Sequence, residues 1–294
     1  MKTRVESVRK SGLRMSFAAA LVLFAVSAAG ETFDLYKAFI STNAATRRAW
    51  MDDADMRKRM ARLGTPPAGA PEFGVPQWYM AHGVDNLRDM GGWVGLDGRH
   101  LRKGLLLRSA HLQSVKDPTA FRVRFEVKTD LDLRTPKETE KLKGKSPLGG
   151  DVTLVNRSAP AYETFGRESG MKYFKELFPL FLDRANYPIV FHCAKGADRT
   201  GSIAFLLQGL LGVCEHDQAI DWELTAFFNP NPKFRDPDRY DKLVALIEAQ
   251  PGGTWTDKFV SYAHACDITD VEVAKFRQIM LEDERTRRQK GKAQ

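Results

Sequence analysis

The chain contains 294 residues, 43% of them hydrophobic and 28% charged, and this composition excludes a mostly disordered protein. Its formal net charge of +8 is concentrated at the two ends, with a net +4 in residues 1–30 and a net +5 in the basic tail, residues 285–294. The remaining residues are nearly neutral in sum, so we expect no general binding of nucleic acid. Three cysteines are too few for a disulfide-built scaffold, and their spacing is not that of a zinc cluster.

Residues 1–30 have the three parts of a secretory signal peptide. A basic segment, Met1–Arg14, precedes the uncharged apolar run Met15–Ala29, and small residues follow up to Gly30. This run of 15 residues is shorter than the roughly 18–20 that a membrane-spanning helix needs, so we expect cleavage rather than a stable membrane span. The sequence therefore predicts an exported protein, periplasmic or secreted.

Residues 31–75 are predicted to form a helical N-terminal appendage and a proline-rich linker. Apolar residues at helical spacing from Phe33 to Leu63 favour one or two short helices. Glycines and prolines in residues 64–71 then interrupt the pattern. We expect the appendage to pack on the main domain, residues 76–284, and a lid over the substrate is the alternative.

Short apolar runs alternate with helical patterns in the main domain. Strands are predicted at residues 105–107, 127–133, 152–155 and 188–192. Helices are predicted at residues 118–125, 170–184, 201–211, 240–249 and 270–282. The alternation predicts an α/β fold whose central, mostly parallel sheet is flanked by helices on both faces. In such sheets, functional groups collect where a strand ends and the next helix begins.

One such junction contains a candidate nucleophile. The run FHCAKGADRTG, from Phe191 to Gly201, lies between a predicted buried strand and an apolar helix. It contains Cys193 and, six residues later, Arg199, a spacing that neither of the other two cysteines has. A loop that enters a helix can turn its N–H groups inward around an anion, and the helix start adds unpaired donors and a positive dipole. Gly196 permits the tight turn, and the Arg199 guanidinium suits two phosphoryl oxygens.

The same positive field favours the ionised form of Cys193. A thiol beside Arg at the start of a helix can have a pKa of about 3.5–7.5, so it is a thiolate near neutral pH. The Thr200 hydroxyl is placed to stabilise the sulfur, and His192 can order the loop from beneath. A thiolate inside an anion-binding loop is an in-line nucleophile for a phosphate ester.

This loop and three earlier segments resemble those of a known enzyme family. HCAKGADRTG is similar to the Cys-x5-Arg loop of cysteine-dependent protein tyrosine and dual-specificity phosphatases. The segments NLRDMGG (86–92), GLLLRSA (104–110) and DLDLRTP (130–136) are similar, in order, to motifs of the bacterial tyrosine phosphatase family related to lipid-phosphate phosphatases. The resemblance covers about residues 76–282, and it is far more specific for the family than for the substrate.

The resemblance implies a phosphotyrosine phosphatase-like fold and a reaction that needs no metal or other cofactor. Cys193 is implied to carry the phosphoryl group and Arg199 to bind it. The other loop residues implied to form the binding site are His192, Ala194, Lys195, Gly196, Ala197 and Thr200. The implied substrate is a phosphorylated protein, with phosphotyrosine or a related group, or a small phosphomonoester.

The residue that protonates the leaving oxygen is the most open assignment. Asp198 resembles an acidic loop residue that some members use in proton transfer, and we rank it first. Asp132 matches another acidic position near the site, at the end of a predicted strand. Glu163, in the loop after strand 152–155, is a third candidate. Asp132 could instead form an ion pair with Arg88 or Arg134, and Asp198 could form a salt bridge or cap the helix.

Other functions start from the same residues. Phosphatases of this fold that act on phosphoinositides or inositol phosphates often have Lys directly after the loop glycine, whereas here Ala197 follows Gly196 and the lysine is Lys195. That substrate class is therefore an alternative that the resemblance does not imply. A rhodanese-type sulfurtransferase also uses a Cys on such a loop, but Arg-Thr-Gly and the earlier segments argue against it. A catalytically dead module should lack Cys193 or Arg199, and a nucleotide-binding P-loop would need Lys-Ser or Lys-Thr after its glycines.

The remaining charged residues and thiols are assigned structural roles. Arg88 and Asp89 are predicted to pin a turn, and lining of the pocket is the alternative. Arg108 and Arg134 are predicted to pair with carboxylates behind the site. Cys214 and Cys266 are predicted to be buried free thiols, with a disulfide as the alternative in an exported protein.

Overall fold

The computed structural model of the chain describes residues 42–55, 83–225 and 237–283. The predicted signal peptide, proline-rich linker and basic tail lie outside these ranges. Within them, no helix combines the length and the apolar character that crossing a bilayer requires.

The centre of the fold is a five-stranded sheet with the strand order β1-β2-β5-β3-β4. The strands are β1 (Arg88–Asp89), β2 (Leu106–Ser109), β3 (Thr129–Asp132), β4 (Thr153–Asn156) and β5 (Ile189–His192). β1 is antiparallel to β2, and all other neighbours are parallel. The four parallel strands confirm the predicted ones. β1 was not predicted, because two charged residues show no apolar alternation.

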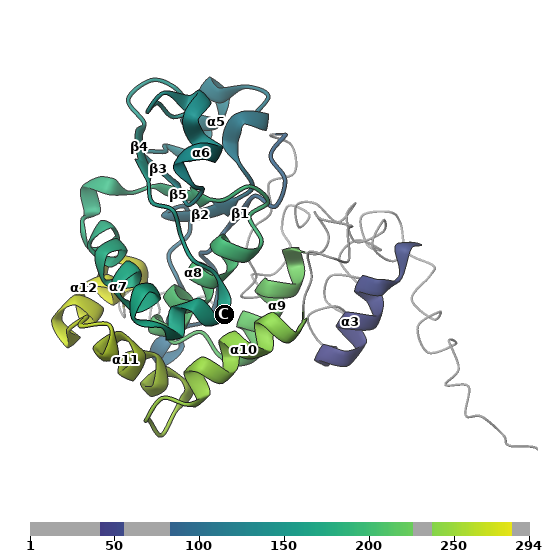
Figure 1. The fold of residues 1–294 in the computed structure, drawn as a ribbon, viewed down its shortest axis with the longest axis vertical. Helices are drawn as coiled ribbons and strands as arrows, with labels where there is room; N and C mark the ends of the chain where they lie inside the picture. The colour runs from purple at the N-terminus through teal and green to yellow at the C-terminus, as the bar shows by residue number, and fades with distance from the viewer. Residues whose placement is uncertain (1–41, 56–82, 226–236, 284–294) are drawn as a thin grey trace, which may run out of the picture.

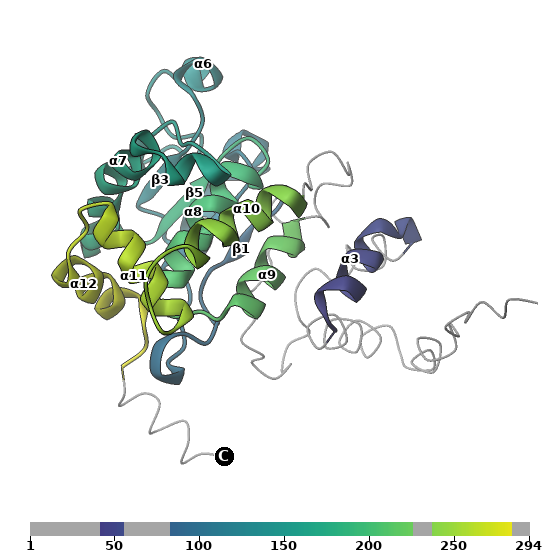
Figure 2. The ribbon, with the colours of Figure 1, turned by 60° about the horizontal axis from the view of Figure 1, so that its bottom comes forward.

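Helices cover both faces of the sheet. The helices are α3 (Ala44–Asp52), α5 (Pro118–Phe125), α6 (Pro136–Thr139), α7 (Glu168–Leu177), α8 (Asp198–Leu210), α9 (Glu215–Leu224), α10 (Pro237–Glu248), α11 (Trp255–Ala265) and α12 (Asp270–Met280). In Figure 1, α5 lies on one side of the strands, and α8 lies on the other side among α7 and α9–α12. Figure 2 shows α8 at the centre of this second layer.

The side chains of β5 explain the two layers. Ile189 and Phe191 belong to the large apolar cluster around α8, whereas Val190 belongs to a smaller cluster around α5. Successive side chains of a strand point to opposite faces, so a strand that is covered on both sides is apolar throughout. The predicted α/β fold, with a mostly parallel sheet between helices, is therefore confirmed.

Two helix predictions need correction, and α6, α9 and α11 have no counterpart among the predicted helix ranges. The predicted helix 170–184 ends as an α-helix at Leu177 and continues as a 3-10 helix over Phe178–Leu182, where Pro179 has no N–H to donate. α8 begins at Asp198 rather than at Gly201, so the Cys-x5-Arg segment extends into the first turn of the helix. α9 was not predicted at all.

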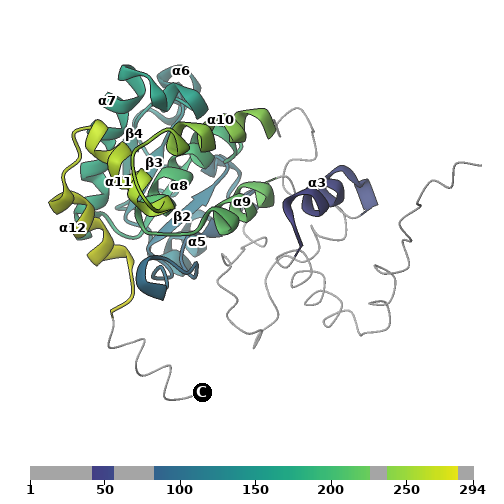
Figure 3. The same ribbon diagram turned by 90° about the horizontal axis from the view of Figure 1, so that it is seen from below.

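The described part of the N-terminal appendage lies against the main domain. Arg47 of α3 and Glu223 of α9 form a buried ion pair, with 2.6 Å between Nε and Oε2. Figure 3 shows α3 beside α9, at the edge of the molecule and away from the sheet. α3 therefore packs on α9.

Candidate active site

The loop between β5 and α8 has a backbone that accepts glycine and little else at one position. Gly196 has φ +66°, and a Cβ on it would lie 2.4 Å from the carbonyl oxygen of Ser109. The loop therefore presses against the end of β2, beside its own strand. A side chain at this position would both strain the backbone and push the loop out of place.

Cys193 lies at the base of this loop and is almost fully buried, with 3% of its surface exposed. Burial alone would raise the pKa of its thiol, but the hydroxyl and N–H of Thr200, the charge of Arg199 and the N–H of Lys195 lower the pKa below its ordinary value. The Thr200 hydroxyl is buried and has no partner among the oxygen and nitrogen atoms of the described residues, so its proton can point at the sulfur. The site thus favours the thiolate.

Arg199 is held by a carboxylate that the sequence did not identify. Glu138, on α6, accepts two hydrogen bonds from the guanidinium, Nη1 to Oε2 at 2.8 Å and Nη2 to Oε1 at 3.0 Å. The N–H of Thr135 also donates to Glu138 Oε2, at 2.8 Å, and closes a capping box at the start of α6. These bonds, with that of Arg199 first, lower the pKa of Glu138 to about 2.

The hydrogen bonds of Glu138 orient Arg199, whose charge in turn interacts with the sulfur of Cys193. The pattern Thr135-x-x-Glu138 is typical of a capping box and marks the start of a helix. It contains no signal that its carboxylate would contact Arg199, which lies 61 residues away in the chain.

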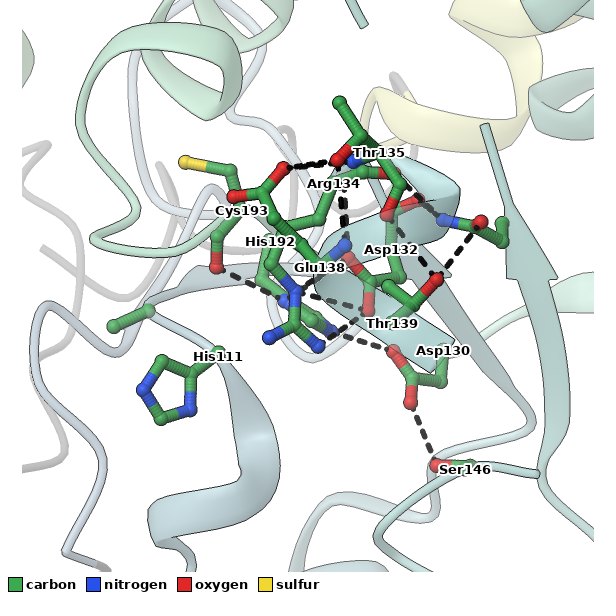
Figure 4. A network of polar contacts seen from close by, with 12 residues as sticks. His111, Asp130, Asp132, Arg134, Thr135, Glu138, Thr139, Ser146, His192 and Cys193 are labelled. Atoms are coloured by element: carbon green, nitrogen blue, oxygen red, sulfur yellow. Dashed lines mark hydrogen bonds and ion pairs between the residues drawn. The ribbon is translucent and has the colours of Figure 1, made fainter. Parts of the chain in front are cut away.

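A buried chain of polar groups lies beneath the sulfur (Figure 4). His192 Nε2 is 2.9 Å from Asp130 Oδ1, His192 Nδ1 is 3.2 Å from the carbonyl oxygen of Cys193, and Ser146 donates to Asp130 Oδ2 at 2.7 Å. Both ring nitrogens lie within hydrogen-bond distance of oxygen acceptors, an arrangement that favours the doubly protonated imidazole. Burial alone would lower the pKa of His192, but the Asp130 carboxylate raises it above its ordinary value. His192 thus supports the loop from beneath, between the Asp130 carboxylate and the carbonyl oxygen of Cys193.

Two arginines behind the loop share one carboxylate. Asp221 of α9 accepts from Arg88 Nε at 2.8 Å and from Arg108 Nη1 at 2.5 Å, and all three side chains are buried. Arg108 also donates to the carbonyl oxygen of Gly196 at 3.0 Å, and Asn86 donates to the same oxygen at 2.8 Å. This cluster fixes the loop from behind. Two positive charges and one negative charge leave a net positive charge beside the anion site.

The contacts of Arg88, Arg108 and Arg134 show which of their predicted structural roles are confirmed. Arg108 and Arg134 do pair with carboxylates, Asp221 and Asp132 respectively. Arg88 is a partner of Asp221 rather than part of a turn. It is the next residue, Asp89, that holds the turn, through hydrogen bonds from the N–H groups of Gly91 at 2.7 Å and Gly104 at 2.6 Å.

The three acidic candidates are in very different places. Asp132 is fully buried, and both of its oxygens accept hydrogen bonds from Arg134, the shortest at 2.6 Å. This arrangement favours the ion-pair role for Asp132 over the role of proton donor. Glu163 is exposed on the 3-10 helix Tyr162–Gly166. Asp198 is part of the anion loop's helix start, is only partly exposed, and accepts a hydrogen bond from the Tyr162 hydroxyl.

The other loop residues differ in their exposure. Lys195 is exposed, Ala194 is partly buried, and Ala197 is buried. Among the residues that the structure describes, no group of three His, Cys, Asp or Glu side chains could hold a metal ion.

The two other cysteines are free thiols in the structure. Cys266 is buried at the end of α11, as predicted. Cys214 is exposed at the start of α9, so its predicted burial was wrong. The unrecognised helix explains the error, because an N-cap residue commonly lies at the surface.

Parts of this chain are similar to a family model and to a curated protein. Residues 79–251, more than half of the chain, match the model of the tyrosine phosphatase family. A Cupriavidus necator protein named "Putative tyrosine-protein phosphatase" is 29% identical over 160 residues, which cover 46% of this chain and 58% of that protein. The chain thus spans somewhat more than half the length of this curated relative. The match to the family model includes the loop from Cys193 to Arg199.

Proposed function

Because the chain belongs to the tyrosine phosphatase family, we propose that it hydrolyses phosphomonoesters, of phosphotyrosine or a related group, through a cysteinyl-phosphate intermediate. The observation that supports the proposal most directly is the environment of the Cys193 sulfur. Its pKa is lowered within a loop that also holds an oriented guanidinium. A buried thiolate beside fixed positive charge is suited to attack an anionic phosphate ester.

In the first proposed step, the Cys193 thiolate attacks phosphorus in line with the bond to the leaving oxygen. The S–P bond forms, the P–O bond breaks, and the carboxyl group of Asp198 gives its proton to the leaving oxygen. Arg199 and the loop N–H groups bind the equatorial oxygens, where the charge of the transferring group is spread.

In the second step, water attacks the cysteinyl phosphate and Asp198 accepts a proton from it. The S–P bond breaks, the thiolate is restored, and inorganic phosphate leaves. These steps use only side chains, the loop N–H groups and water, so we expect a chelator to leave the rate unchanged.

The test is hydrolysis of para-nitrophenyl phosphate by the whole chain. We expect Cys193→Ser to abolish turnover and vanadate to inhibit the unmodified protein. Cys214→Ser, which removes a thiol at the surface, is the matched control and should keep full activity. If Cys193→Ser retained turnover, the cysteinyl-phosphate mechanism would be wrong.

The natural substrate can be sought by measuring hydrolysis of a panel of phosphorylated compounds. A panel of phosphotyrosine, phosphoserine and phosphothreonine peptides, phosphoinositides and inositol phosphates should show the highest kcat/KM for phosphotyrosine under this proposal. A preference for the inositol lipids would instead favour the alternative substrate class. Thiocyanate formation from thiosulfate and cyanide would indicate the sulfurtransferase.

We also propose that the protein is exported. The support is the pattern of residues 1–30, with its basic segment and its short apolar run. N-terminal sequencing of the mature protein from the producing cell should find a start between Ala28 and Glu31, and recovery of an intact Met1 would contradict export by cleavage.

A further inference from the structure

Tyr162 is tied to the first turn of α8 at both of its ends. Its backbone N–H donates to Ser202 Oγ at 2.9 Å, and its hydroxyl donates to Asp198 Oδ1. Ser202 Oγ in turn donates to the carbonyl oxygen of Asp198 at 2.9 Å. A side chain 36 residues away in sequence is thereby held against the acidic residue of the loop.

The backbone of Tyr162 has an unusual conformation for its residue type. Its φ is +56°, a left-handed value that a bulky aromatic residue rarely adopts. Such residues occur where the surroundings enforce the conformation, often at functional sites. Here the ring packs edge-on against Trp222, with centroids 6.0 Å apart, and the Arg239 guanidinium lies 5.1 Å from the ring centroid. The ring is therefore fixed from two sides.

The Tyr162 hydroxyl stays protonated and can therefore donate a hydrogen bond. Burial and the neighbouring Asp198 carboxylate raise the pKa of Tyr162 above its ordinary value, so the hydroxyl keeps its proton throughout the pH range of the reaction. A phenol has one proton, and in this structure that proton is directed at Oδ1 of Asp198. Oδ2 is then the oxygen left to hold a transferable proton.

We propose that Tyr162 is a positioning residue that fixes the Asp198 carboxyl group and assigns its transferable proton to Oδ2. This inference rests on the proposed function, in which Asp198 is the proton donor. When Oδ2 gives its proton to the leaving oxygen, negative charge develops on the carboxylate. The hydrogen bond from Tyr162 then becomes charge-assisted and strengthens, so it stabilises the transition state more than the ground state.

The test is Tyr162→Phe, which removes only the hydroxyl and keeps the ring. The readout is kcat/KM for a series of aryl phosphates, because this constant reports the step in which the leaving oxygen departs. We expect kcat/KM for phenyl phosphate to fall about 10–100-fold, the range for the loss of a hydrogen bond to a charged group. For para-nitrophenyl phosphate the fall should be much smaller, because nitrophenolate leaves with little need for a proton. A uniform fall across the series would overturn the proposal.

A double-mutant cycle separates this inference from the assignment of the acid. In an Asp198→Asn background, Tyr162→Phe should cause no further selective loss. If Asp198→Asn itself leaves the leaving-group dependence unchanged, the acid assignment fails. If Asp198→Asn steepens that dependence and Tyr162→Phe does not, only the role of Tyr162 fails.

Two further variants guard against effects on folding. Tyr173→Phe removes a hydroxyl that bonds to the backbone oxygen of Arg157, outside the site, and should leave the leaving-group dependence unchanged. Ser202→Ala removes the partner of the Tyr162 N–H, so it should give a weaker loss with the same selectivity for phenyl phosphate. If Tyr162→Phe does not fold, a uniform loss in Ser202→Ala would overturn the proposal.

Discussion

Replacing Asp221 with Asn would leave two buried guanidiniums without their shared counter-ion. Arg88 and Arg108 are 0% and 1% exposed in their side chains, and Asp221 is 3% exposed, so water cannot take over the role of the carboxylate. The amide of Asn offers one acceptor oxygen in place of two, and its NH2 group would face an arginine that has no acceptor.

The expected effect on stability is large. Removing one partner of a buried ion pair typically costs about 3–5 kcal/mol, because the remaining charge is buried and uncompensated. For a domain of this size, each kcal/mol lowers Tm by roughly 2–4 °C, so we expect a fall of about 6–20 °C. Burial alone would raise the pKa of Asp221, but Arg88 and Arg108 hold it below its ordinary value. Its contribution is therefore complete above the ordinary pKa of Asp, near 4, and is lost as the pH falls through the lower pKa of the folded state.

Thermal unfolding at pH 7, followed by circular dichroism, measures this effect. Asp241→Asn is the matched control, because Asp241 is 60% exposed and pairs only loosely with Arg48, at 3.6 Å. An exposed pair of this kind contributes about 0–1 kcal/mol, so the control should lower Tm by less than roughly 4 °C. If Asp221→Asn behaved like the control, the cluster would not be what holds the loop from behind.

Three other changes test the site from different directions. Glu138→Gln should lower kcat/KM about 10–100-fold, because Arg199 loses its bidentate partner and with it the orientation that phosphate binding requires. The free energy of unfolding should change little, since the pair is partly exposed. Gly196→Ala should abolish activity, because a Cβ would lie 2.4 Å from a carbonyl oxygen of β2 at a backbone φ of +66°. Iodoacetamide at pH 7–8 should modify Cys193, whose pKa is lowered, and spare Cys266, whose pKa burial raises to about 11.

Each of these predictions has its own control or contrary outcome. Glu140→Gln removes a nearby exposed carboxylate and should keep full activity. Gly144→Ala shares the strain of a positive φ, +74°, but meets no atom within 4 Å, so it isolates the contribution of the clash. Peptide mapping identifies the alkylated cysteine, and modification of Cys193 only above pH 9 would contradict a stabilised thiolate.

The parts of the fold that were predicted well depend on local sequence. The strand Ile189–His192 begins with three apolar residues because both faces of the sheet are covered, and that run is visible in the sequence. The helix Pro118–Phe125 starts at a proline after Asp117, whose side chain caps it, and the prediction had the same bounds. α9 was missed because three of its five buried residues are polar, Gln218, Asp221 and Glu223, so its apolar pattern is weak.

In the candidate site, too, the features that depend on local sequence were predictable and the contacts between distant segments were not. The sequence by itself determined the nucleophile candidate Cys193, the glycine of its loop and the arginine six residues on, because a strand-to-helix loop brings its own atoms together whatever surrounds it. Only the tertiary structure decided which carboxylate orients Arg199, that Asp221 serves two arginines, and that Asp132 is occupied by Arg134 while Asp198 meets Tyr162. Hydrogen bonds and ion pairs form between atoms a few ångströms apart in space, and most of these partners lie tens of residues apart in the chain, where spacing carries no information about distance.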